Sequence, residues 1–253
     1  MNRAADPGAR GATSSSRRLL APLRASARAL PPVLALALVP AVTLAHNVAA
    51  ADRAALAAAR GAQPFIYAYL GAKHMVTGYD HLLFLLGVIF YLYRVREVAG
   101  YVTLFALGHS LTLIGGVLGG VRVNSYLIDA VIGFSVVYKS FENLGGFKAL
   151  FGGALNGRAA VFGFGLFHGL GLATKIQELS LSRESLAGNL IAFNVGVELG
   201  QLLALLLMVL FINIWRRAAD FPRQAFVANA VIMACGFTLM GYQLTGYFVG
   251  VRS

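Results

Sequence analysis

Charged residues are scarce in this sequence. Asp, Glu, Lys and Arg together make up 12% of its 253 residues, while hydrophobic residues make up 58%. A soluble domain carries about 25% charged residues, so this composition excludes an ordinary soluble protein. The hydrophobic residues are gathered into long runs, which predicts an integral membrane protein embedded in a lipid bilayer.

Cysteine and acidic residues are also few. The single cysteine, Cys235, lies in an apolar run, and one cysteine excludes a disulfide framework within the chain. The 10 acidic residues against 21 Lys and Arg give a formal net charge of +11, which can indicate a nucleic-acid partner. Here the basic residues lie at the N-terminus and in short connections, where they direct membrane insertion. We therefore predict no nucleic-acid partner.

Residues 1–50 have the composition of a signal-like segment. A basic stretch precedes a short apolar run at 31–45, which Pro40 interrupts and which is too short to span a bilayer comfortably. Small residues permit cleavage before His46 or near Ala50, and an uncleaved anchor helix is the alternative. Residues 51–74 mix alanine with charged and aromatic residues, which predicts an amphipathic segment on the outer surface of the membrane.

Residues 75–250 predict an all-α fold, a polytopic membrane bundle of about six transmembrane helices. The apolar runs place these helices at 75–93, 98–119, 125–145, 159–176, 187–214 and 226–249. Three alternate connections hold a basic excess, namely Arg94, Arg96, Lys148, Arg158, Arg216, Arg217 and Arg223. By the positive-inside rule these connections are cytoplasmic, which puts both ends of the mature chain outside a bacterial-type inner membrane.

Histidines and acids inside the apolar runs carry the chemical signal of this sequence. An ionisable group at the centre of a membrane helix costs about 2.5–3.5 kcal/mol on insertion scales, so such groups tend to face a partner, a cavity or a metal. His74, Asp80 and His81 lie at the start of the first predicted span. If this stretch is one helix, His74, Gly78 and His81 share a face, and the glycine leaves room between the rings.

Three further groups are expected near the middle of the bilayer. His109, His168 and Glu198 each lie about ten residues from the end of a span, or roughly 15 Å. Imidazole and carboxylate together suit nickel, zinc, iron, cobalt and copper, whereas calcium and magnesium prefer oxygen ligands. The predicted metal ligands are therefore His74, Asp80, His81, His109, His168 and Glu198, and the accessory polar candidates are Asp129, Glu142, Asn194 and Gln201. A hydrogen bond that joins two helices is the alternative for any single histidine.

Some of the polar residues also have structural interpretations. Lys139 and Glu142 are three residues apart on one predicted helix, which favours a neutralised pair. Asp129 could cap a helix or pair with Arg122 near the outer surface. Residues 105–113 and 164–172 agree at five of nine positions, histidine included, and this pattern could mark a parallel repeat because both spans run in the same direction.

The first motif, His74-x-x-x-Gly78-x-Asp80-His81, resembles the first-helix signature of the HupE/UreJ family of hydrogenase and urease accessory membrane proteins. The family is regarded as containing nickel permeases, and the resemblance implies that this motif binds the ion. The wider resemblance, to the HupE/UreJ-like subgroup, covers residues 62–250 and includes Gly108-His109-Ser110-Leu111-Thr112-Leu113, Glu142-Asn143-Leu144, Phe167-His168-Gly169-Leu170-Gly171 and Phe193-Asn194-x-Gly196-Val197-Glu198-Leu199-Gly200-Gln201.

The leading hypothesis is a permease that brings a divalent transition metal ion, nickel before the others, into the cytoplasm. The motif that begins at His74 would capture the ion from outside, and the deeper ligands would hold it midway. No ATP-binding motif is present, so a gradient or a downstream trap would drive uptake. The alternatives are an intramembrane metalloenzyme with an apolar substrate, which we favour less, and a non-catalytic membrane assembly protein. The metal ion and the bilayer are the predicted partners, and a homo-oligomer or a membrane-protein partner stays open.

Overall fold

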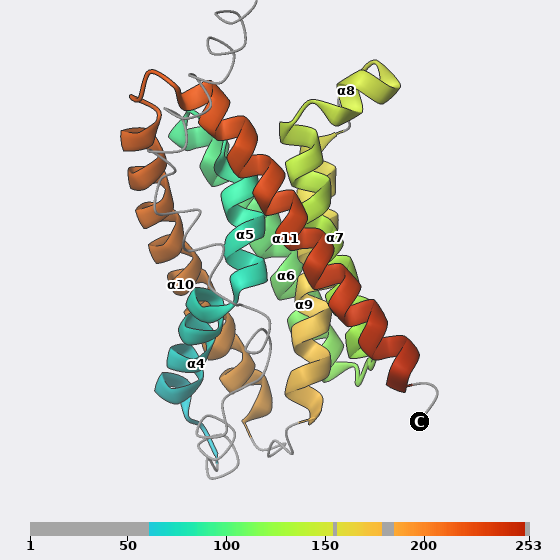
Figure 1. The fold of residues 1–253 in the computed structure, drawn as a ribbon. Helices are drawn as coiled ribbons and strands as arrows, with labels where there is room; N and C mark the ends of the chain where they lie inside the picture. Colours follow the sequence, from blue (N-terminus) through green and yellow to red (C-terminus); the bar gives the residue numbers. More distant parts are fainter. Residues whose placement is uncertain (1–60, 154–155, 179–184, 251–253) are drawn as a thin grey trace, which may run out of the picture. The chain divides into compact units, whose positions relative to one another are not determined.

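The computed structural model describes residues 61–153, 156–178 and 185–250 (Figure 1). These residues form helices and no strand, which confirms the predicted all-α fold. The signal-like segment 1–50 lies outside the described residues and stays a prediction. The helices are α4 (Pro64–Thr77), α5 (Tyr79–Ile89), α6 (Val95–Leu118), α7 (Ser125–Asn143), α8 (Gly146–Phe151), α9 (Gly157–Glu178), α10 (Leu186–Trp215) and α11 (Phe221–Gly250).

Within the described ranges, four helices are long and apolar enough to cross a membrane: α6, α9, α10 and α11. Helix α7 has 19 residues but carries Asp129, Lys139 and Glu142. Helix α5 is apolar but has only 11 residues. The chain is therefore a membrane helix bundle, as the sequence predicts. The count of six crossings stays a prediction, in which α7 and the α4–α5 pair supply the other two.

The first predicted span, 75–93, is broken at Gly78, where α4 ends and α5 begins. Gly78 has φ −75° and ψ 95°, at the edge of the β region that any residue can adopt. Space is what demands a glycine, because a Cβ atom there would lie 2.9 Å from His81 Nδ1 and 3.0 Å from the carbonyl oxygen of His74. The prediction of one continuous helix with His74, Gly78 and His81 on a single face is therefore wrong.

Helix α4 packs along α10 through glycine contacts. A Cβ atom on Gly196 would overlap the carbonyl oxygen of Ala68, and one on Gly200 would lie 2.7 Å from the carbonyl oxygen of Ala72. Small residues of this kind let membrane helices approach closely. We predicted that residues 51–74 would lie on the membrane surface. The described part of that segment belongs to α4, which packs along α10, and its place relative to the membrane stays a prediction.

Helices α6 and α9 form a second close pair and run in the same direction (Figure 1). A Cβ atom on Gly108 would lie 2.5 Å from the carbonyl oxygen of Phe162, and one on Gly165 would lie 2.5 Å from that of Phe105. The two backbones therefore touch at glycines contributed by both helices. The pattern shared by residues 105–113 and 164–172 lies at this contact.

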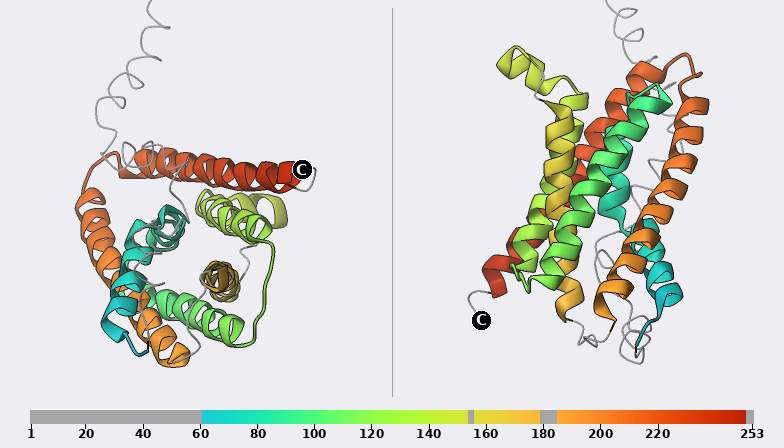
Figure 2. Two further views of the ribbon diagram at one scale, coloured as in Figure 1. Left: turned by 90° about the horizontal axis from the view of Figure 1, so that it is seen from below. Right: turned by 180° about the vertical axis from the view of Figure 1, so that it is seen from behind.

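Helices α7 and α11 form a third pair, in which Gly133 meets Met240 and Gly236 meets Val137. Seen from below, α5 and α9 lie inside an arrangement of α6, α7, α10 and α11 (Figure 2). Helix α5 contacts α7, α10 and α11 as well as its two neighbours in the chain. This placement carries the first residues of α5, Asp80 and His81, into the interior of the bundle.

The connections α5–α6, α7–α9 and α10–α11 lie at the same end of the bundle (Figure 1). They are the three connections that carry the basic excess, so the fold gathers this charge at one end. The orientation of that end toward the cytoplasm stays a prediction.

Arg216, at the C-terminal end of α10, holds the C-terminal end of α5. Its Nη2 donates to the carbonyl oxygens of Ile89, Phe90 and Leu92 at 3.2, 2.7 and 2.9 Å. Its guanidinium carbon also lies 4.1 Å from the ring centroid of Tyr93. The last carbonyls of a helix have no partner within the helix, so this arginine caps α5 and fixes it against α10.

Candidate functional site

Four histidines gather around one ring, that of His81. The centroid of the His81 ring lies 4.8 Å from that of His168, 5.2 Å from that of His74 and 6.0 Å from that of His109. His81, His109 and His168 are each 1% exposed, whereas His74 is half-buried. The four rings come from α4, α5, α6 and α9, and we call them the histidine cluster.

The start of α5 fixes the orientation of the central ring. Nδ1 of His81 lies 3.1 Å from Oδ1 of Asp80, and both side chains are buried. An ionised carboxylate only accepts hydrogen bonds, so Nδ1 of His81 is the donor beside it, and in a neutral ring Nε2 then carries the lone pair. Metal-binding histidines in proteins usually donate their other ring N–H to a carboxylate or a carbonyl in this way.

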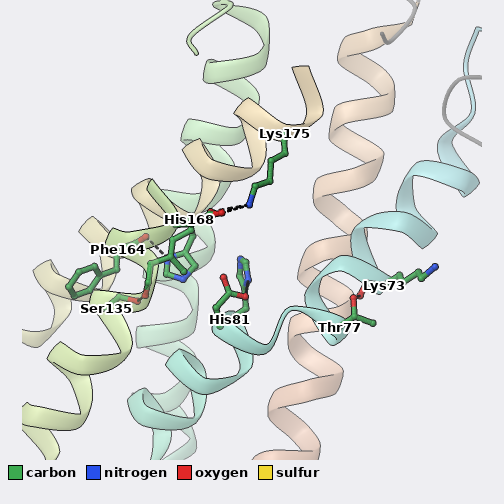
Figure 3. A network of polar contacts seen from close by, with 10 residues as sticks. Lys73, Thr77, His81, Ser135, Phe164, His168 and Lys175 are labelled. Atoms are coloured by element: carbon green, nitrogen blue, oxygen red, sulfur yellow. Dashed lines mark hydrogen bonds and ion pairs between the residues drawn. The ribbon is translucent and has the colours of Figure 1, made fainter. Parts of the chain in front are cut away.

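His168 has the same arrangement with a backbone partner. Its Nδ1 donates to the carbonyl oxygen of Phe164, one turn earlier in α9, at 2.8 Å. In a neutral ring this bond again leaves Nε2 as the nitrogen with the lone pair. His168 and His81 lie next to each other where α9 faces α5 (Figure 3). Two oriented imidazoles from different helices therefore meet in the interior.

His109 differs from His81 and His168 in the hydrogen bonding of its ring nitrogens. Among the described residues, neither of its ring nitrogens has a hydrogen-bond partner. A buried polar group without a partner is rare in native proteins and unfavourable. Within the described residues, His109 therefore makes no hydrogen bond that joins two helices.

Phenylalanines enclose the cluster, and the sequence analysis did not single them out. Phe105 lies 5.1 Å from His168 and 6.1 Å from His109, and Phe84 lies 5.4 Å from His168, measured between ring centroids. Phe84 and Phe105 are fully buried. One signal was available, since Phe105 belongs to the pattern shared by α6 and α9. These rings keep the surroundings of the imidazoles apolar.

A closed metal site is not assembled in this arrangement. In the part of the chain that the structure describes, no three His, Cys, Asp or Glu side chains are placed so that they could hold one ion together. The histidine cluster consists of neighbouring rings around His81.

The comparisons with known proteins agree with these motifs. The family model described as HupE / UreJ protein matches residues 50–251. The chain belongs to the HupE/UreJ family. No curated protein and no solved structure matches the chain. Within this HupE/UreJ protein, the matched region contains the whole histidine cluster and every helix described above.

Glu198 is exposed, unlike the buried rings of His81, His109 and His168 with which the sequence analysis grouped it. Its side chain is exposed on α10, and it accepts a hydrogen bond from Nδ2 of Asn194 at 3.2 Å. Asn194 Nδ2 also donates to Oγ of Ser110 at 2.8 Å. Asn194 and Gln201 are buried at 8% and 2% exposure, whereas Glu198 is exposed, so the polar residues of α10 lie partly in the interior and partly at the surface.

The remaining accessory candidates form ion pairs with lysines. Lys139 Nζ lies 2.5 Å from Oε2 of Glu142, which confirms the predicted neutral pair. Asp129 is bound by Lys175 Nζ at 2.7 and 2.9 Å. The predicted pairing of Asp129 with Arg122 is wrong, because α9 extends far enough to bring Lys175 beside α7. Both acids of α7 are thus neutralised within the protein.

Proposed function

We propose that this HupE/UreJ protein carries a divalent transition metal ion across the membrane, with nickel as the first candidate substrate and zinc, iron, cobalt and copper fitting the same donors. The observation that carries the proposal is the convergence of His74, His109 and His168 on His81 inside an apolar bundle. Intramembrane ionisable groups that face one another usually mark an ion or substrate pathway.

The donor chemistry supports this substrate class. Neutral imidazole nitrogens suit first-row transition metals, and Asp80 supplies the negative charge that favours a cation beside His81. Protons compete with the metal for the same nitrogens, so uptake is expected to weaken in acid.

The spacing of the rings supports passage in steps. Metal–nitrogen bonds of 2.0–2.1 Å place the centroids of two imidazoles on one tetrahedral ion roughly 5 Å apart. The pairs that His81 forms with His168 and His74 have centroid distances of 4.8 and 5.2 Å. In the proposed pathway the ion meets half-buried His74 first, passes to His81 and continues to His168 and His109.

The test is uptake of radioactive nickel by cells that express the wild type or a His81→Ala/His168→Ala variant. We expect the double variant to lose at least about tenfold in uptake, because two of the ligands are removed. A matched control is Thr238→Ala/Thr245→Ala, since both hydroxyls are exposed on α11 and bond only to carbonyls of their own helix. Equal uptake by the wild type and the histidine variant would overturn the proposal.

Elemental analysis of the purified protein separates transport from a resident metal. A transported ion exchanges with added metal, and its bound amount falls in His81→Ala. Stoichiometric metal that does not exchange would contradict transport and favour an intramembrane metalloenzyme.

A further inference from the structure

Three phenylalanines lie one helical turn from members of the histidine cluster. Phe84 on α5, Phe105 on α6 and Phe164 on α9 each lie three or four residues from the clustered histidine of the same helix. Helix α5 runs toward the end of the bundle that carries the basic connections, which we call the basic end, whereas α6 and α9 run away from it (Figure 1). All three residues are therefore one turn nearer to the basic end than the histidines. We call Phe84, Phe105 and Phe164 the phenylalanine layer.

The rings of the phenylalanine layer pack against one another and against the cluster. The centroid of the Phe84 ring lies 5.3 Å from that of Phe105 and 5.8 Å from that of Phe164, within the usual range for aromatic pairs. Phe84 and Phe105 also contact His168, at 5.4 and 5.1 Å between ring centroids. Phe84 and Phe105 are fully buried, and Phe164 is half-buried. Apolar rings from three helices therefore border the cluster on the side of the basic end.

A second polar group lies beyond this layer, nearer to the basic end. It consists of Tyr101, Lys139 and Glu142, which we call the Lys139 group. Tyr101 lies one turn beyond the layer on α6, and a Cβ atom on Gly157, at the start of α9, would lie 3.2 Å from its hydroxyl and 3.4 Å from Oε1 of Glu142. A Cβ atom on Gly87, one turn beyond the layer on α5, would lie 3.2 Å from Cγ of Lys139. The Lys139 group therefore adjoins the same three helices as the layer.

The order along α5, α6 and α9 toward the basic end is thus the histidine cluster, the phenylalanine layer and the Lys139 group. On α6 the rise from His109 to Tyr101 is about 12 Å at 1.5 Å per residue. Between two polar regions, an apolar constriction stops an ion because water is excluded from it. An ion held by the histidine cluster therefore cannot reach the Lys139 group while the rings of the layer stay packed.

We propose that the phenylalanine layer is the barrier that holds the metal ion at the histidine cluster, and that the ion passes to the basic end only when these rings move apart. The inference rests on the proposed transport function and extends it by naming what divides the path. Phe84 is central to the barrier, because its ring contacts both of the others. A polar side chain in its place would leave a gap with polar groups on both sides, which is what a water molecule needs.

The first experiment measures proton leak into lipid vesicles that contain the purified protein and no metal. A potassium gradient with valinomycin drives the protons, and a dye inside the vesicles reports the pH. The control for Phe84→Ser is Phe90→Ser, because Phe90 is equally buried but packs against Trp215 and Phe221 at the C-terminal end of α5. We expect the leak through Phe84→Ser to exceed that of the wild type by at least about fivefold, and that of Phe90→Ser and Phe84→Leu by less than about twofold.

Equal leaks through Phe84→Ser and Phe90→Ser would overturn the proposal. If Phe84→Ser does not fold, Phe164→Ser replaces it, since a substitution at half-buried Phe164 disturbs the packing less. We expect Phe164→Ser to leak at least about threefold faster than the wild type. A leak through Phe164→Ser at the wild-type level would contradict a barrier made of all three rings.

The second experiment follows nickel moving down its gradient into the same vesicles, reported by a dye that nickel quenches. A barrier limits passage rather than binding. We therefore expect Phe84→Ser to raise the maximal rate by at least about threefold and to change the half-saturating nickel concentration by less than about twofold. A change in the half-saturating concentration alone would place Phe84 in the binding site and overturn the barrier. Wild-type protein that moves no nickel would overturn the proposed transport, whereas the proton leak, measured without metal, still decides whether the layer divides the two polar regions.

Discussion

The histidine cluster and Glu198 lie in opposite surroundings. His81 and His168 are 1% exposed, and each donates one ring N–H to a neighbouring oxygen. Glu198 is exposed among leucines and valine. The sequence pattern of a polar residue inside an apolar run is the same in both regions. The face of the helix on which the residue lies decides whether its side chain is buried in the bundle or exposed on its surface.

The comparison also separates two uses of a carboxyl group. Asp80 is buried and orients an imidazole, so its charge acts on the interior. Glu198 accepts a hydrogen bond from Asn194, and its carboxyl group is exposed on the surface of α10. Four pairs of variants compare a packed position with an exposed one, beginning with the largest expected effect.

Gly169→Ala should be the most damaging substitution. A Cβ atom there would overlap the carbonyl oxygen of His109 and the hydroxyl of Thr112, so α6 and α9 would have to separate. We expect the free energy of unfolding in detergent to fall by about 3 kcal/mol. Gly188→Ala on exposed α10 meets nothing within 4 Å and should be neutral or stabilising by up to about 1 kcal/mol. If a denaturant titration shows that Gly169→Ala and Gly188→Ala lower the free energy of unfolding equally, the close packing of α6 and α9 at Gly169 is contradicted.

Asp80→Asn and Glu198→Gln make the same chemical change in the two regions. Asp80→Asn removes the charge that orients His81, and we expect nickel uptake to fall by about tenfold. Glu198→Gln should change uptake by less than about twofold, because Glu198 lies outside the histidine cluster. If Glu198→Gln lowers uptake as strongly as Asp80→Asn, Glu198 belongs to the metal pathway and the two regions are not distinct.

Gly78→Ala should disturb the site more than the fold. The added methyl group would press on His81 Nδ1 and on the carbonyl oxygen of His74. We expect uptake to fall by roughly fivefold while the free energy of unfolding falls by less than about 1.5 kcal/mol, since the ring can shift more easily than a helix. Gly100→Ala, with nothing within 4 Å of the added atom, is the control for uptake and stability. Unchanged uptake in Gly78→Ala would show that the ring position is not critical.

Arg216→Lys should have the smallest effect. A lysine amine cannot reproduce the planar guanidinium that reaches three carbonyl oxygens and covers Tyr93. We expect the free energy of unfolding to fall by about 1 kcal/mol, measured by the same titration. Arg217→Lys, at an exposed neighbouring position, should leave stability unchanged. A loss as large in Arg217→Lys would show that the effect does not come from the cap on α5.

Much of the helical architecture could be predicted because apolar runs of about 20 residues must form helices when they cross a bilayer. The predicted spans 98–119 and 187–214 differ from α6 and α10 by only a few residues. The break at Gly78 could not be predicted in this way, because glycine is common inside membrane helices. It follows from the approach of the His81 ring, which is visible only once α5 is packed.

The sequence by itself determined that this chain is a helical membrane protein of the HupE/UreJ family with imidazoles and acids inside its apolar segments. Tertiary structure alone decided that four histidines meet around His81, that Asp129 pairs with Lys175 and that Glu198 faces outward. The physical reason is that residue spacing fixes the face of a side chain on its own helix. The rotation of each helix about its axis is set by backbone contacts at glycines such as Gly108, Gly165 and Gly196, which belong to pairs of helices.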